Sequence, residues 1–331
     1  MEKQSEINTK NGNVIVRILK NAINLEEIGV ISALLAMGIF LGITTDKFLT
    51  ARNLLEISRQ ASYVGIMAIG MVFVISTGNI DLSVGAIYML SPVVAALALE
   101  AGFNEYLAML IGLMVGLLCG FINGGLSVLL RIPMIVITLG TTSIFRGLGL
   151  VVSNARPIHD FPKDTGLFQI GGEFIGPFPT SAVVMFVLVI LFTIVYNLTP
   201  WGNRVRAVGA NLEAAKFSGV RVNLINISVM VFQGLMCAIA GILAMLFLRV
   251  AEPTQGGGYE MYTISAAIIG GTSLTGGAGS IIGAFIGAII ISVIRNGLVL
   301  LGVHYYWTGV ATGIVIIAAV FLDYLVTAKR E

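Results

Sequence analysis

The polar groups that could do chemistry in this chain lie among long apolar runs, and the most prominent is the motif Gly78–Gly85 (GNIDLSVG). Asp81 is its charged residue, with Asn79 and Ser83 beside it, and burying an unpaired charge within a membrane is costly. Three roles are open to Asp81. It could cap a helix that begins near Leu82, line a hydrophilic pathway, or bind a coupling proton or sodium ion.

A second glycine-rich motif, Gly270–Ala278 (GGTSLTGGA), matches Gly78–Ala86 at Gly, Leu, Ser/Thr and Ala positions. Each motif follows an apolar run and precedes another, which predicts an internal repeat of broken-helix elements. Thr272 and Ser273 supply the hydroxyl groups of the second motif. We expect them to occupy a position equivalent to that of the polar residues in the first.

Other polar residues fall within apolar runs, namely Asn123, Arg146, Arg295 and Asn296. The two arginines could contact a hydroxylated solute. Alternatively, their long side chains could snorkel to the outer interface, which is the simpler explanation for both.

Motifs of common enzyme sites are absent from the sequence. It has no G-x-x-x-x-G-K-[ST] phosphate loop and no H-E-x-x-H, and it contains only two histidines. No nucleophile–base pair or metal-ligand cluster stands out. We therefore expect a non-catalytic chain without a cofactor or metal of its own.

The elements that position these residues must lie in a membrane. Of the 331 residues, 57% are hydrophobic and 11% are charged, against about 25% charged in a typical soluble domain. A helix needs roughly 20 apolar residues to span a bilayer, and open strand edges are excluded there. The predicted fold is an all-α polytopic membrane protein with about ten transmembrane helices and broken or re-entrant elements.

The expected spans are residues 28–44, 60–77, 83–100, 106–129, 133–152, 180–198, 223–248, 263–274, 281–298 and 307–325. The eighth is short and ends in glycines, as a broken or re-entrant helix would. Most Lys and Arg residues of the loops lie on one side if both termini are cytoplasmic. Residues 1–27 then form a cytoplasmic segment, either an interfacial helix or a loose tail, residues 28–325 the transmembrane domain, and residues 326–331 a cytoplasmic tail.

Two glycine stripes predict close helix packing. Glycines recur every four residues at Gly112, Gly116, Gly120 and Gly124, and again at Gly279, Gly283 and Gly287. Small residues at this spacing let two helix backbones approach within the membrane. Packing inside one subunit is the preferred interpretation, and a dimer contact is the alternative.

A helix-prone polar island lies within residues 199–223, and we interpret it as a cytoplasmic docking loop. Glu213 and Lys216 can pair across its exposed face, and Ala214 and Ala215 keep one face small enough for a groove in a partner. Gly209 and Gly219 bracket a short helix and suit turns at its ends. A second large loop, 154–180, lies on the outer side, either as a landing surface or as a plain connection.

Several of these motifs together resemble the permease subunits of bacterial ATP-binding-cassette (ABC) sugar importers of the ribose type. The resemblance includes GANLEAAKFSGV (Gly209–Val220), GNIDLSVG, TLGTTSIFRG, GGTSLTGGAGSIIGAFIGA (Gly270–Ala288) and RNGLVLLGV (Arg295–Val303). It extends from about Phe48 to the last span, and the order of the motifs makes it specific.

The resemblance implies a permease pair in the inner membrane, docked by two cytoplasmic ATP-binding subunits and supplied by a periplasmic or lipid-anchored sugar-binding protein. The implied docking residues are Gly209, Asn211, Glu213, Ala214, Ala215 and Gly219. The candidate pathway residues are Asn79, Asp81, Ser83, Arg146, Thr272, Ser273 and Asn296. D-ribose is the expected sugar, with other pentoses, galactose-like hexoses and a furanose-type signalling molecule open.

Two other functions compete with the importer. The first is an ion-coupled secondary transporter or channel for a small polar solute, with Asp81 as its ion or proton site. The second is a polytopic membrane enzyme, which the lack of an acid–base or metal constellation disfavours. The sequence leaves open whether the permease pair consists of two copies of this chain or of two different permeases.

Overall fold

The computed structural model describes residues 25–162, 166–172 and 174–304, together with residues 307, 309–311, 313, 314 and 317. The described elements are α2 (Leu25–Thr44), α3 (Ala51–Ser76), α4 (Val84–Glu100), α5 (Glu105–Leu130), α6 (Met134–Ser153), α7 (Gly166–Gly172), β1 (Phe174–Ile175), β2 (Phe178–Pro179), α8 (Thr180–Leu198), α9 (Pro200–Ala210), α10 (Leu212–Phe217), α11 (Val222–Leu248), α12 (Tyr259–Ile269) and α13 (Ile281–Leu300).

Six of the described helices are long and apolar enough to cross a membrane, namely α3, α5, α6, α8, α11 and α13. Apolar helices that are shorter occur at Leu34–Thr44 of α2 and at α4. Every expected span from 28–44 to 281–298 overlaps a described helix. Most of the expected span 307–325 falls outside the described residues, and the terminal segment before residue 25 and the tail 326–331 lie wholly outside them.

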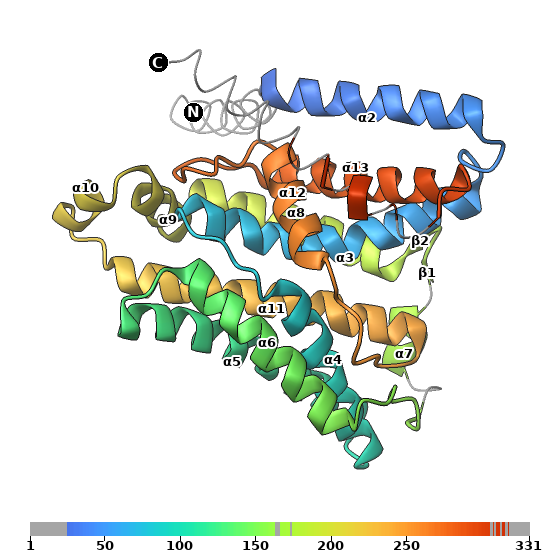
Figure 1. Cartoon of the computed structure of the whole chain (residues 1–331), viewed down its shortest axis with the longest axis horizontal. Helices are drawn as coiled ribbons and strands as arrows, with labels where there is room; N and C mark the ends of the chain where they lie inside the picture. The colour runs from blue at the N-terminus through green and yellow to red at the C-terminus, as the bar shows by residue number, and fades with distance from the viewer. Residues whose placement is uncertain are drawn as a thin grey trace, which may run out of the picture.

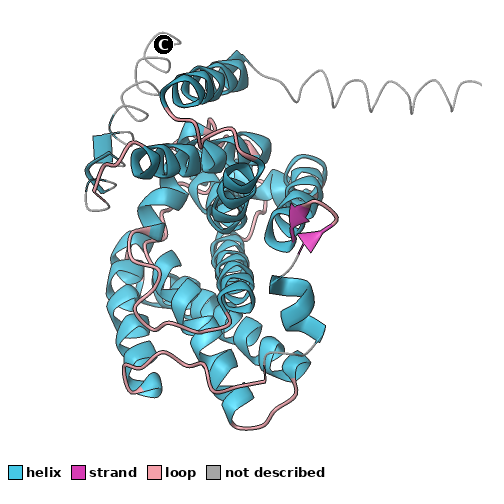
Figure 2. Ribbon diagram, turned by 90° about the vertical axis from the view of Figure 1, so that its right-hand side faces the viewer, coloured by secondary structure: helices cyan, strands magenta, loops and turns pink. Residues whose placement is uncertain are grey.

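The long helices run between two ends of the molecule (Figure 1). One end carries α9 and α10, and we call it the α9–α10 end. The other carries α7 and the short hairpin of β1 and β2, and we call it the α7 end. Figure 2 looks at the α7 end, so that many of the helices appear nearly end-on.

The loop 154–180 is more than a plain connection, because it contains the short helix α7 and the antiparallel strand pair β1–β2.

The eighth expected span is the 11-residue helix α12, which begins inside the bundle. The chain leaves α11 at Leu248 and returns to the start of α4, where a Cβ atom on Gly85 would overlap the Gly256 carbonyl oxygen. Gly85 lies 15 residues before Glu100, the last residue of α4. At 1.5 Å per residue, the contact with Gly256 is therefore roughly 22 Å along the helix axis from that end of α4. α12 then runs toward the α9–α10 end, so it is the half-helix that its length and glycines indicate.

The first glycine stripe packs α5 against α11 of the same chain. A Cβ atom on Gly116 would lie 2.5 Å from both the Gly234 carbonyl oxygen and the Ala238 Cβ atom, and one on Gly120 would overlap the Met230 carbonyl oxygen. These contacts confirm the prediction of packing within one subunit. Close backbone approach replaces a hydrophobic driving force, which lipid does not provide.

In the second stripe, Gly283 and Gly287 pack against the end of α12. Cβ atoms on these residues would overlap the carbonyl oxygens of Gly270 and Ala266. Gly279 precedes α13, so the expected helical stripe is shorter than predicted.

We predict that Gly116→Ala lowers the melting temperature of the purified protein, because an added methyl group in a filled interface costs about 1–3 kcal/mol. Gly125→Ala is the matched control, since Gly125 lies on the same helix with no atom within 4 Å of its Cβ position. There Ala should be neutral or stabilising by about 0.5–1 kcal/mol. Equal melting temperatures of the two variants would contradict this account of the α5–α11 interface.

Candidate functional site

The polar island folds into two short helices joined by a capping residue. Pro200 occupies the first turn of α9, where its missing N–H is not needed, and the Thr199 hydroxyl accepts a hydrogen bond from the Gly202 N–H. α9 ends at Asn211, whose side-chain oxygen accepts a 2.9 Å hydrogen bond from the Ala214 N–H. Asn211 therefore starts α10 at the point where α9 stops.

Aromatic packing holds α9 against the long helices. The Trp201 ring stacks on Phe73 of α3 with centroids 4.7 Å apart, and its N–H donates a 2.9 Å hydrogen bond to Ser228 of α11. Tyr196 and Phe232 add edge contacts to the same Phe73 ring. Because the partly buried Trp201 side chain is large and its one donor is satisfied here, α9 is fixed to α3 and α11.

Gly209 brings the two glycine-rich motifs and the island together. A Cβ atom on Gly209 would overlap the Ser76 carbonyl oxygen and lie 2.6 Å from the Gly277 nitrogen. The Gly277 N–H donates a 3.0 Å hydrogen bond to that Ser76 carbonyl. A Cβ atom on Gly276 would lie 3.0 Å from the Gly78 nitrogen and from the Gly209 Cα atom.

The expected turn at Gly209 is therefore wrong. The residue lies within α9, and glycine is needed there because the backbones of α3, α9 and the loop after α12 touch. By contrast, Gly219 has a φ of +78° and its N–H bonds to the Lys216 carbonyl, which confirms the predicted turn after α10. No atom lies within 4 Å of its Cβ position, so Gly219 faces open space.

The outer face of α10 is exposed and carries two large apolar side chains, Leu212 and Phe217. Glu213 and Lys216 form a 2.8 Å ion pair, as expected. Ala214 is exposed whereas Ala215 is buried, so only the first of the two alanines can present a small surface to a partner. Phe217 is 90% exposed. Sequence reasoning missed it, although a lone Phe in an otherwise polar island is a detectable signal.

Asp81 is the last acceptor in a buried chain of hydrogen bonds. Thr141 of α6 donates to Asn123 of α5 at 2.6 Å, Asn123 donates to the Ser83 hydroxyl at 2.7 Å, and Ser83 donates to Asp81 at 2.7 Å. The Ser83 N–H also donates to the same carboxylate oxygen. Asp81 is fully buried, and this chain of bonds ties the start of α4 to α5 and α6.

The remaining candidate pathway residues are dispersed. Asn79 donates to Thr77 at 3.0 Å, and Ser273 bonds to the nearby Thr275 hydroxyl, while Thr272 is buried. Arg146 contacts the turn before α12 and the first residues of that helix. Its Nη2 atom lies 3.3 Å from the Gly256 carbonyl oxygen and 3.9 Å from a carboxylate oxygen of Glu260.

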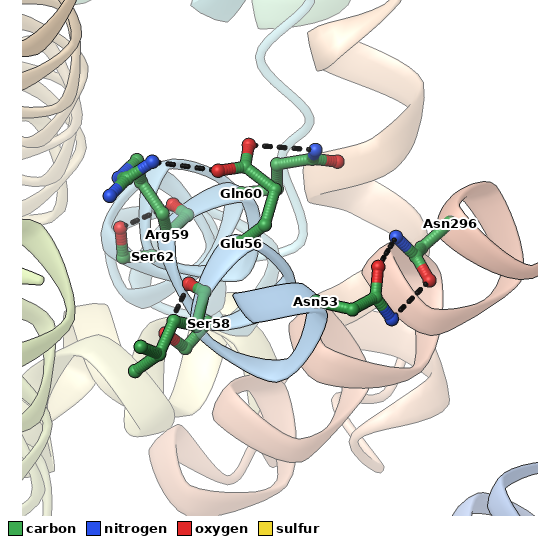
Figure 3. A network of polar contacts seen from close by, with 8 residues as sticks. Asn53, Glu56, Ser58, Arg59, Gln60, Ser62 and Asn296 are labelled. Carbon is green, nitrogen blue, oxygen red and sulfur yellow. Dashed lines mark hydrogen bonds and ion pairs between the residues drawn. The ribbon is translucent and has the colours of Figure 1, made fainter. Parts of the chain in front are cut away.

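Asn296 lies on α13 toward the α7 end and exchanges two amide hydrogen bonds with Asn53 of α3, at 3.0 and 2.8 Å (Figure 3). Its partner is therefore the first turn of α3. The structure does not gather the seven candidate pathway residues on one surface. Among the described residues, no group of three or more His, Cys, Asp or Glu side chains is placed to hold a metal ion.

Comparison with known proteins identifies the family. A family model described as the permease component of a branched-chain amino acid transport system matches residues 53–320. The ribose import permease protein RbsC of Bacillus subtilis is 38% identical over 300 residues, which cover 90% of this chain and 93% of that protein. This chain belongs to the ribose-type family of ABC sugar permeases.

Other relatives of the permease are named for different sugars. The fructose import permease protein FrcC of Rhizobium meliloti and the D-allose transport system permease protein AlsC of Escherichia coli are each 38% identical. Both matches cover 88% of this chain, with 82% of the first protein and 89% of the second. No solved structure is a significant match. With its apolar helices, the permease is a multi-pass protein of the inner membrane.

We predict that Asn123→Leu destabilises the permease, because the Ser83 and Thr141 hydroxyls lose their shared partner and a buried unpaired polar group costs about 1–3 kcal/mol. Asn197→Leu is the matched control, since Asn197 is exposed and its amide bonds only to the Thr193 carbonyl of its own helix. Thermal unfolding in detergent measures both. A control that melts as early as Asn123→Leu would refute the structural role of this network.

Proposed function

We propose that the permease carries D-ribose inward across the inner membrane, powered by separate ATP-binding subunits that dock on α9 and α10. A substrate-binding protein would deliver the sugar to the α7 end. The observation that carries this proposal is that Trp201 and Gly209 pack α9 closely against the long helices, while Phe217 at the end of α10 is exposed. Transport of monosaccharides is what the names of the ribose, fructose and allose relatives have in common.

The proposed docking surface consists of α10 and its flanking turns, and it faces the cytoplasm. Its members are Gly209, Asn211, Glu213, Ala214, Ala215 and Gly219, joined by Phe217. Within this set Phe217 inserts into the partner, Asn211 and Gly219 shape the two ends of α10, and Ala215 and Gly209 hold the surface to the bundle. Large exposed aromatic side chains are frequent anchors of protein interfaces, which supports this assignment.

Coupling would pass through the backbone contacts of α9. A movement of the docked subunits would shift α9, and Gly209 would transmit the shift to Ser76 of α3 and to Gly277 before α13. Contacts between backbones are stiff because no flexible side chain lies between them. α3 ends at this contact and α13 begins shortly after it, and both helices lead from there to the opposite end of the bundle.

D-ribose is proposed over fructose and allose because the ribose permease of Bacillus subtilis aligns over slightly more of this chain. The binding protein would set most of the selectivity. ATP hydrolysis would occur in the partner subunits, so the permease itself would be a non-catalytic component. A second copy of the same chain is the proposed partner within the membrane.

The ion-coupled alternative has less support. It needs an ion or proton to reach Asp81, which is fully buried. One of its carboxylate oxygens accepts two hydrogen bonds from Ser83, while the other has no hydrogen-bond partner among the described residues. Capping the region where α4 begins accounts for these bonds without a bound ion.

The deciding experiment is co-purification from the native membrane through a tag on the permease, followed by an ATPase assay. We expect an ATP-binding subunit in the eluate whose activity rises with ribose-loaded binding protein. Fructose and allose, tested in the same assay with the same binding protein, would rank the sugars. Isolation of the permease alone, with solute uptake driven by an ion gradient, would overturn the proposal.

Phe217→Ala should reduce recovery of the ATP-binding subunit at least tenfold, because loss of an anchor side chain costs about 2 kcal/mol or more. The permease itself should fold normally, since Phe217 contributes little to its core. Phe178→Ala is the control: Phe178 is also an exposed Phe, at the α7 end. Equal subunit recovery from the two variants would remove Phe217 from the interface.

Gly219→Leu should abolish sugar uptake while leaving the permease in the membrane. The left-handed φ costs a non-glycine residue about 1–2 kcal/mol, and the added side chain would project toward the docked subunit. Gly102→Leu is matched, because Gly102 also has a left-handed φ of +88° and open space at its Cβ position. It lies between α4 and α5, away from α9 and α10, so the Gly102 variant should still retain the ATP-binding subunit during purification, whereas the Gly219 variant should lose it. Wild-type uptake by the Gly219 variant would contradict the assignment.

A further inference from the structure

A polar cavity of about 450 Å³ lies between α3, α4, α11, α12 and α13, at the end of the bundle opposite the proposed docking surface. The side chains that line it include Glu56, Arg59, Tyr88, Tyr259, Tyr262 and Arg295. Thr254 and Gly257 also border it, and both are exposed, so the cavity opens to the surface. Of these residues, only Arg295 drew attention in the sequence.

The inner wall of this cavity is the start of the half-helix α12. Gly256 and Gly258 adopt left-handed φ values of +85° and +83°, which let the chain turn back and begin α12 at Tyr259. Broken helices that begin near mid-membrane place backbone N–H groups at the substrate sites of many transporters. Here the first turn of α12 borders the cavity.

Charged groups in the cavity are already held in place. The Arg59 guanidinium lies 3.8 Å from the Phe247 ring centroid and 2.7 Å from one carboxylate oxygen of Glu56. The other Glu56 oxygen accepts a hydrogen bond from Gln60 at 3.1 Å (Figure 3). Arg295 lies 4.5 Å from the Tyr262 ring centroid, and no carboxylate of the described residues lies within ion-pair distance of it.

Aromatic rings make up much of the remaining wall. The Tyr88 and Tyr259 centroids are 4.7 Å apart, and the Tyr259 and Tyr262 centroids are 5.9 Å apart. Aromatic faces are apolar and carry negative potential, so they suit the C–H face of a sugar ring better than an anion. Arginine donors and a carboxylate acceptor complement the hydroxyl groups on its edge. Polar side chains inside a membrane protein are costly and therefore indicate function.

We propose that this cavity is a low-affinity binding site for a monosaccharide entering from the outer side, with Arg295 and Glu56 as its hydrogen-bonding residues and the tyrosines as its stacking surface. The proposal rests on the proposed sugar import and specifies where the sugar first contacts the permease. The volume lies within the range of about 300–1,000 Å³ typical of small-molecule sites and leaves room for a pyranose or furanose together with water.

Cysteine protection tests the site directly. Thr254→Cys places a thiol at the rim, while the native Cys119 and Cys237 are both buried, so a maleimide added to the permease–ATPase complex in nanodiscs reports on position 254. Thr275→Cys is the matched control, because Thr275 is exposed in the loop next to Gly78, toward the α9–α10 end. The probes are ribose, fructose and allose, with leucine as a non-sugar solute.

We expect a transported sugar to slow labelling at position 254, by about tenfold at ten times its dissociation constant, without affecting position 275. Leucine should not protect. Arg295→Gln in the Thr254→Cys background should remove the protection. Arg52→Gln, at an exposed position near the start of α3 that does not line the cavity, should keep it.

Uptake of radiolabelled sugar by reconstituted Thr254→Cys complex separates failure of the site from failure of the function. If that complex imports sugar but no sugar slows labelling, the site is refuted and the importer stands. If Arg295→Gln weakens capture of the binding protein but leaves sugar protection intact, the cavity is a docking surface and the proposal is wrong. If the wild-type complex imports none of the sugars, the proposed function fails and this inference fails with it.

Discussion

The structure depends on close contact between peptide backbones at Gly209. Three segments far apart in the sequence meet there: the end of α3, the end of α9 and the loop that follows α12. Each supplies a glycine or a main-chain carbonyl, and the approach is too close for any side chain to fit between them. Lipid offers helices no hydrophobic reason to associate, so backbone fit must supply the packing.

The same constraint explains the rest of the bundle. α5 and α11 touch along a glycine face, and α13 touches α12 through Gly283 and Gly287. Polar groups within the membrane must bond to one another, which the chain from Thr141 to Asp81 achieves with each donor matched to an acceptor. Tight packing and this chain of hydrogen bonds favour a rigid interior, as the proposed coupling between the two ends would require.

The two ends of the bundle have different surface chemistry. The α9–α10 end presents a short helix with one exposed aromatic side chain, an arrangement suited to a protein partner. Toward the other end, α3, α11, α12 and α13 surround a cavity lined by arginine, glutamate and tyrosine, an arrangement suited to a small hydroxylated ligand. α3 and α13 reach both regions and so connect them physically.

Much of this could be predicted from the amino-acid sequence. Long apolar runs require membrane helices, glycines four residues apart require close helix packing, and the pairing of Glu213 with Lys216 follows from helical spacing. These are local properties, and local spacing determines them. Only the tertiary structure decided that Gly209 packs rather than turns, that Ala215 faces inward, that Phe217 projects outward and that Arg295 shares a cavity with Glu56. Those outcomes depend on which distant segments touch, and one-dimensional spacing carries no information about contacts between residues more than a hundred positions apart.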